Sequence, residues 1–101
     1  MYHSRKKKKP FHVKKHFTRR CLERIGFPID ADKLKELRAS NSLQFVYRQS
    51  NTRTHWLVPM SLLPKGFERE LVAVYDSVRH EFVTVLYLCP EYNDFVMEED
   101  E

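Results

Sequence analysis

Residues 71–89 read LVAVYDSVRHEFVTVLYLC, and this stretch decides the fold. Two apolar runs rich in β-branched residues flank the mostly polar residues 76–80, a pattern that predicts a β-hairpin with strands over 71–75 and 81–89. The second run is apolar at nearly every position, which is typical of a strand covered on both faces. We therefore expect it to be a central strand of a sheet.

Two further strands precede this hairpin. The runs over 43–48 and 54–58 alternate in the manner of strands, and Ser50, Asn51 and Thr52 between them predict a turn. Pro59 ends the second run, and a long connection over 59–69 leads to the hairpin. The four runs together predict a meander that is mostly antiparallel.

Two helices are predicted ahead of the strands. Apolar side chains recur every four residues over 12–25, namely at Val13, Phe17, Cys21 and Ile25. Gly26 then supplies a usual helix end. A shorter helix over 30–40 begins at Asp30, whose side chain suits an N-cap, and buries Leu34 and Leu37.

These elements predict one α+β domain, with two N-terminal helices packed on a four-stranded, mostly antiparallel sheet. A length of 101 residues suits a single domain. We expect a disordered basic arm over 1–10, the α+β domain over 11–90 and an acidic tail over 91–101. The helices must cover one face of the sheet, so a ligand is expected on the other face.

Charge is strongly segregated along the chain, although the net charge is only +4. Residues 1–24 hold ten Lys or Arg and one acid, whereas residues 91–101 hold six acids and no base. A basic head indicates an anionic partner such as RNA or another nucleic acid, although a solubilising tail has the same composition. The candidate nucleic-acid-binding residues are Arg5, Lys6, Lys7, Lys8, Lys9, Lys14, Lys15 and Arg19.

Several classes of protein are disfavoured. No apolar run approaches the roughly 20 residues of a membrane-spanning helix, and no apolar segment follows the N-terminal charges as in a signal peptide. Two cysteines without CxxC spacing are expected to be reduced thiols, which favours a cytoplasmic protein without a membrane partner. No glycine-rich phosphate loop and no metal-ligand spacing occur, so we expect no cofactor and no metal.

His16, Arg20 and Arg24 are spaced by four residues along the first predicted helix. At about 100° per residue they form one stripe, which borders the apolar stripe. A guanidinium at the margin of a core is partly desolvated and needs an anionic partner. That partner is either a ligand phosphate or acidic side chains of the protein itself, such as Asp76, Glu81 or the tail acids.

The pattern His16-x3-Arg20-x3-Arg24-Ile25-Gly26, followed by Val74-Tyr75-Asp76 and Phe82-Val83-Thr84-Val85-Leu86, resembles the barnase–EndoU–colicin–RelE superfamily. These are small, metal-independent ribonucleases and toxins. The resemblance covers roughly residues 12–88. It departs from the family at Ile25, where arginine and glycine are often adjacent. It implies an RNA-cleaving, toxin-like activity for this chain.

The residues fit such chemistry. Cleavage of RNA without a metal needs a base, a proton donor and positive charge beside the phosphorus. His16 is the candidate base or acid, and Arg20 and Arg24 are candidates for binding phosphate oxygens in a forked geometry. Thr84 is the fourth candidate catalytic residue. It interrupts an apolar strand in phase with Phe82, Leu86 and Leu88, and its hydroxyl contacts either a ligand or a neighbouring group.

Two other functions stay open from the sequence. The chain is alternatively a nucleic-acid-binding protein without catalysis, in which the acidic tail limits non-specific binding. It is alternatively a small phage-type effector that binds and inhibits a host protein through that tail. Trp56 is similarly ambiguous, because a tryptophan serves either as a core anchor or as a stacking platform for a base.

Overall fold

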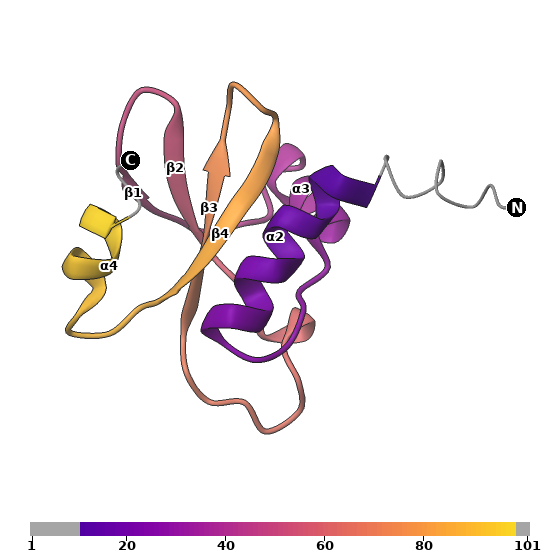
Figure 1. The fold of residues 1–101 in the computed structure, drawn as a ribbon, viewed down its shortest axis with the longest axis vertical. Coiled ribbons are helices and arrows are strands. Elements are labelled where there is room, and N and C mark those ends of the chain that lie inside the picture. The colour runs from indigo at the N-terminus through magenta and orange to yellow at the C-terminus, as the bar shows by residue number, and fades with distance from the viewer. Residues whose placement is uncertain (1–10, 99–101) are drawn as a thin grey trace, which may run out of the picture.

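The computed structural model describes residues 11–98, and within the first helix it describes side chains only from His16 onward. Its elements are α2 (Phe11–Arg24), α3 (Ala31–Ala39), β1 (Phe45–Arg48), β2 (Arg53–Leu57), the 3₁₀ turn η1 (Met60–Leu62), β3 (Leu71–Asp76), β4 (Glu81–Tyr87) and α4 (Tyr92–Glu98). The predicted α+β fold is confirmed (Figure 1). The basic arm over 1–10 and residues 99–101 of the acidic tail lie outside the described residues.

The first two helices begin and end close to the predicted positions. α2 buries Phe17 and the free thiol of Cys21, and it ends shortly before Gly26, whose φ of 86° strains any residue with a Cβ. The side chain of Asp30 accepts a 3.0 Å hydrogen bond from the backbone N–H of Lys33, which confirms it as the N-cap of α3. No helix within residues 11–98 is long and apolar enough to cross a bilayer.

The sheet is an antiparallel meander in the order β1-β2-β3-β4. The helices α2 and α3 lie on one side of it (Figure 1). There Phe17 and Leu34 pack against Leu71, Tyr75 and Val85 in the main core. The predicted strand order along the chain is therefore confirmed, and every strand pair is antiparallel.

The position predicted for β4 is wrong, because β4 is an edge strand rather than a central one. Its residues 82–86 are nevertheless buried. Phe82 and Val85 face the core beneath the helices, whereas Val83 and Leu86 face a second apolar cluster on the opposite side. The sequence of β4 is apolar because other parts of the chain cover both faces of this strand. It is not apolar because neighbouring strands lie on both of its edges.

A β-bulge changes the phase of β4 at Val83. Thr84 pairs with Val74 and so shares its face of the sheet. Phe82 belongs to the core beneath the helices, whereas Leu86 joins the cluster on the other face. The prediction that Thr84 shares a face with both Phe82 and Leu86 is therefore wrong for Phe82. Strict alternation along the sequence does not anticipate the extra residue.

The acidic segment, predicted only as a tail, contains the helix α4. Val96 of this helix is buried against Val74, Val83 and Leu86 on the sheet face away from α2 and α3 (Figure 1). That face was predicted to be left for a ligand. Part of it instead holds a helix of this chain, because the valine and phenylalanine of α4 need apolar cover.

A buried histidine joins α4 to the sheet. His55 on β2 is fully buried, and its Nε2 donates a 2.8 Å hydrogen bond to the Gln49 side-chain oxygen. Its Nδ1 then accepts a hydrogen bond from the hydroxyl of Tyr92 at the start of α4. Burial raises the pKa of Tyr92 to about 12, so this hydroxyl keeps its proton. The three side chains therefore form a polar connection in an apolar layer.

This connection predicts a loss of stability in acid. Burial, assisted by the charge of Arg53, lowers the pKa of His55 to about 4. Between pH about 6.5 and 4 the unfolded chain binds a proton that the folded chain does not. The free energy of unfolding therefore decreases as the pH is lowered through this range. The full difference amounts to about 3 kcal/mol. Urea unfolding measured at several pH values checks it.

The matched variants are His55→Gln, which keeps hydrogen-bonding groups but cannot titrate, and His80→Asn at an exposed turn position. We expect the first to flatten the pH dependence and the second to leave it unchanged. An unaltered pH dependence in His55→Gln would show that acid acts elsewhere in the molecule.

A candidate anion-binding site beside the edge strand

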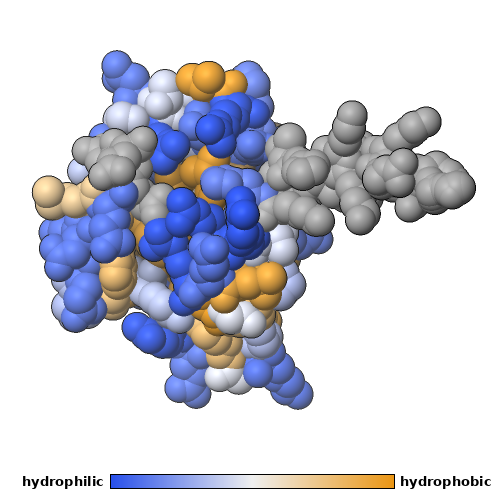
Figure 2. All heavy atoms as spheres, viewed as in Figure 1, coloured by the Kyte–Doolittle hydropathy of each residue, from blue (hydrophilic) through white to orange (hydrophobic). Residues whose placement is uncertain are grey.

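A basic hollow of about 430 Å³ lies where α2, the start of β2 and the β3–β4 turn come together. Among the residues that the structure describes, four arginines, one histidine and one carboxylate line it, and the full set is His16, Arg20, Arg24, Arg53, Arg79, Val83 and Glu98. Figure 2 shows strongly hydrophilic side chains gathered at the centre of the view, between the positions of α2 and α4. The excess of positive charge makes this basic hollow attractive to anions.

Helix α2 supplies three of these side chains. Because Phe17 and Cys21 hold α2 against the sheet, the neighbouring stripe of His16, Arg20 and Arg24 is turned toward β4. Arg20 lies 3.9 Å from Glu23, an exposed pair one helical turn apart that holds it only weakly. The predicted stripe is thus brought together on one wall of the hollow.

The opposite wall comes from a strand and a turn that share one carboxylate. Asp76 at the end of β3 accepts hydrogen bonds from the backbone N–H groups of Val78 and Arg79, at 2.9 and 3.3 Å. The Nε of Arg53 lies 3.4 Å from the same carboxylate. Burial alone raises the pKa of Asp76, but these donors outweigh it and leave the pKa below its usual value. Asp76 therefore positions both arginines while staying ionised.

His16 is shifted toward its neutral form. Burial is the largest cause of its lowered pKa, and the charges of Arg20, Arg79 and Arg19 act in the same direction, against a smaller opposing effect of Glu81. A neutral imidazole at pH 7 has one ring nitrogen free to take a proton. The histidine in this hollow is therefore suited to act as a base.

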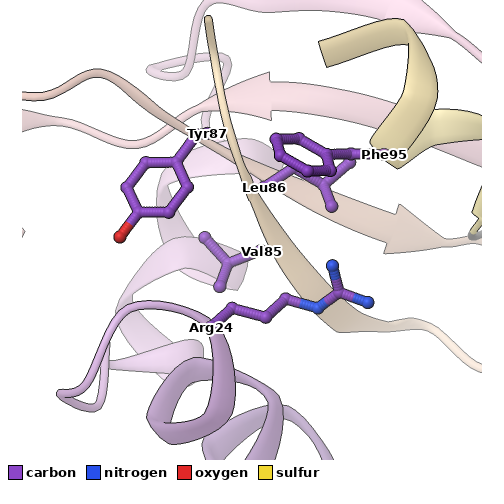
Figure 3. A pocket seen from close by; sticks show the side chains of 5 residues that line it. All are labelled: Arg24, Val85, Leu86, Tyr87 and Phe95. Atoms are coloured by element: carbon purple, nitrogen blue, oxygen red, sulfur yellow. The ribbon is translucent and has the colours of Figure 1, made fainter. Parts of the chain in front are cut away.

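Arg24 extends the positive charge along β4. Its side chain runs from the end of α2 past Val85, toward the side of the strand on which Leu86 and Phe95 lie (Figure 3). These residues and Tyr87 line a smaller, mostly apolar hollow of about 200 Å³. Arg24 lines both hollows, so its aliphatic part packs on apolar groups near its charged end.

Thr84 is not brought to this site. Its side chain is buried on the face shared with Val74, it does not line the basic hollow, and its hydroxyl oxygen is buried without a hydrogen-bond partner. Arg19 is exposed on α2 and does not line the hollow either. The other candidate nucleic-acid-binding side chains, Arg5, Lys6, Lys7, Lys8, Lys9, Lys14 and Lys15, lie outside the described part of the chain.

Two arginines of the lining, Arg53 and Arg79, were missed in the sequence, whereas Glu98 is one of the tail acids named as alternative partners of the stripe. The signal for Arg79 was available, because a basic residue in the turn of a tight hairpin projects near the ends of both strands. Arg53 and Glu98 reach the hollow only through strand register and the docking of α4. Neither of these follows from residue spacing.

Chemically, guanidinium groups arranged beside a neutral imidazole can bind an anion with several oxygens, such as a phosphate diester. Within residues 11–98 no group of three or more His, Cys, Asp or Glu side chains is arranged to hold a metal ion. Comparisons with protein-family models, with curated protein sequences and with solved structures found no match for this chain.

Proposed function

We propose that this protein binds RNA in the basic hollow and cleaves it without a metal ion, the activity that the sequence resemblance implies. One observation carries the proposal: four arginines and a histidine from three separate segments surround a single hollow. Gathering like charges at one place is unfavourable, and the carboxylates of Asp76 and Glu98 offset only part of the charge of four arginines, so a bound anion would stabilise the arrangement further. RNA supplies that anion in its phosphodiester groups.

The arginines would bind and polarise the phosphate. A guanidinium donates two parallel hydrogen bonds to phosphate oxygens, and several guanidinium groups together can surround the non-bridging oxygens. Their effect grows as negative charge builds on the phosphorane, because arginines already in position need no reorganisation. Arg53 has a fixed position through Asp76, which favours such preorganisation.

His16 would take the role of general base. Its neutral form removes the proton from the 2′-hydroxyl of RNA, and that oxygen attacks the adjacent phosphorus. The bond to the 5′ oxygen then breaks, and this oxygen takes up a proton, either from the protonated His16 or from solvent water, which leaves a 2′,3′-cyclic phosphate and a 5′-hydroxyl. DNA has no 2′-hydroxyl, so this chemistry is restricted to RNA.

A second candidate function is RNA binding without catalysis. It is favoured by Thr84, because the hydroxyl that the resemblance associates with catalysis is buried away from the hollow. Glu98 also lines the hollow and would compete with phosphate for the arginines, as expected of a protein that limits non-specific binding. Binding needs the arginines, whereas cleavage additionally needs His16.

The proposal predicts RNA cleavage that persists in excess EDTA. Four arginines repel a divalent cation, so the hollow does not require one for the reaction described above. Purified protein is incubated with an RNA oligonucleotide and with the DNA oligonucleotide of the same sequence. We expect cyclic-phosphate products from RNA alone, with the same rate in EDTA.

Activity lost in EDTA and restored by Mg²⁺ would overturn the mechanism. Tight RNA binding without any cleavage would instead favour the second candidate function.

A further inference from the structure

Besides the basic hollow and the small apolar hollow next to Arg24, a further hollow lies on the other side of the β3–β4 turn. We call it the second hollow, because it is the second one with a positive charge. It encloses about 360 Å³ and is lined by residues of α3, β1, β2, β3 and the turn, among them Arg38, Arg48, Trp56, Tyr75 and His80. This volume is within the range of small-molecule sites, roughly 300–1,000 Å³. His80 lines this hollow, whereas its neighbour Arg79 lines the basic hollow. The two hollows are therefore adjacent across one turn.

The charge of this second hollow is positive. Arg38 and Arg48 line it together with His80, and no Asp or Glu is among its described lining residues. The guanidinium carbon of Arg38 lies 3.7 Å from the centre of the Tyr75 ring, a stacking that fixes its plane. The Nε of Arg38 is buried without a hydrogen-bond partner. An anion in the hollow would add the interactions that these donors favour.

The same hollow has a flat aromatic wall. The indole N–H of Trp56 donates a 2.8 Å hydrogen bond to the hydroxyl of Thr54, which holds the ring in one orientation. Phe45 packs edge-on against the ring, with centroids 5.4 Å apart. Trp56 remains partly exposed and lines the hollow. A tryptophan held in this way is a platform for another planar ring.

Both features are needed to identify the ligand. A phosphate alone gains nothing from an indole face, and a purely apolar ligand would leave the charges of Arg38 and Arg48 without an anion in the hollow. A nucleotide combines a planar base with an anionic phosphate on one small molecule. The hydroxyl and amide groups of Asn51, Thr52 and Ser77, which also line the hollow, can pair with the polar edge of a base.

We propose that this second hollow binds one nucleotide of single-stranded RNA, with its base against Trp56 and its phosphate on Arg48 and Arg38. The inference rests on the proposed function and deepens it, because it gives the basic hollow a neighbouring subsite. The RNA strand crosses the β3–β4 turn at Arg79 and His80. The hollow thereby selects an unpaired base, since a base inside a duplex cannot stack on a protein side chain.

Trp56 is the only tryptophan in the sequence, so intrinsic fluorescence reports directly on this hollow. The purified protein is titrated with adenosine 5′-monophosphate, with adenosine and with inorganic phosphate. We expect saturable quenching by the monophosphate, about a hundredfold weaker binding of adenosine because the contacts of its phosphate with both arginines are lost, and no quenching by phosphate. Quenching of equal midpoint by adenosine and the monophosphate would overturn the proposed phosphate contact.

Three variants sharpen this test. Arg48→Gln should weaken binding of the monophosphate about tenfold. Arg69→Gln removes the same charge at the ring of Tyr87, away from both hollows, and should leave binding unchanged. Arg20→Ala alters only the basic hollow and should also leave it unchanged. Equal effects of Arg48→Gln and Arg69→Gln would mean general charge attraction and overturn the subsite.

An RNA trinucleotide separates RNA from a free nucleotide as the ligand. We expect it to bind at least tenfold more tightly than the monophosphate, and Arg20→Ala to remove most of that gain. Equal affinities would overturn the assignment to RNA. Saturable quenching without RNA cleavage would overturn the proposed function but keep the subsite, whereas cleavage without quenching would overturn the subsite alone.

Discussion

Replacing His16 by alanine is expected to lower the rate of RNA cleavage by roughly 10²–10⁴-fold and to leave RNA affinity almost unchanged. A neutral imidazole adds little to the binding of a phosphate in the ground state, but it removes a proton in the transition state. The measurement is single-turnover cleavage together with fluorescence anisotropy on a labelled oligonucleotide. The pH profile of the wild type should rise with pH through a pKa below the usual value for histidine, because burial and nearby arginines favour the neutral form.

His80→Asn is the control for the chemical step alone, because His80 lines the neighbouring hollow rather than the basic hollow. RNA affinity is expected to change in this variant, but the single-turnover rate constant at saturating protein is expected to stay the same. Thermal melts exclude damage to the fold, since His16 precedes Phe17 of the core. Full cleavage by the His16→Ala protein would contradict the assignment of the base.

Replacing Arg20 by alanine is expected to reduce both cleavage and binding. A guanidinium contacts phosphate in the ground state and stabilises it further as charge builds, so the rate should fall about 10²-fold. RNA affinity should also fall, and the slope of log K against log salt should become shallower by about 0.7 for each lost single-strand phosphate contact. Filter binding at four salt concentrations measures both quantities.

The adjacent Arg19 gives a closely matched control. Arg19→Ala removes the same charge from the same helix, but Arg19 is exposed and does not line the basic hollow. We expect a small loss of affinity and an unchanged rate constant for cleavage. Equal losses in the two variants would show that only the net charge of α2 matters, and the hollow would not be the site.

Much of the fold could be predicted from local chemistry. The four-residue spacing of Phe17 and Cys21 identified α2, and the N-cap Asp30 identified the start of α3. The centrality of β4 could not be predicted, because an apolar strand has the same sequence whether strands or helices cover it. The bulge at Val83 arises from the pairing of β4 with β3. No residue type within β4 indicates this bulge in the sequence.

The candidate site was predictable only where it is helical. The spacing of His16, Arg20 and Arg24 follows from the geometry of one helix, so the sequence places them on one stripe. Arg53 depends on how β2 pairs with β3, and Glu98 depends on the packing of Val96 against the sheet. Such residues are brought in by tertiary contacts, and the bulge that places Thr84 away from the basic hollow likewise depends on strand pairing.

Because β4 is an edge strand, the arginines of α2 beside it also affect whether two copies of the protein can pair. The last strand of a sheet is a template on which another polypeptide can pair, and charged side chains beside such a strand discourage intermolecular assembly. Arg24 lies along Val85 to Tyr87 of this strand. Its charge is therefore expected to disfavour pairing of β4 with a second copy of the protein. A variant without these charges is expected to aggregate more readily.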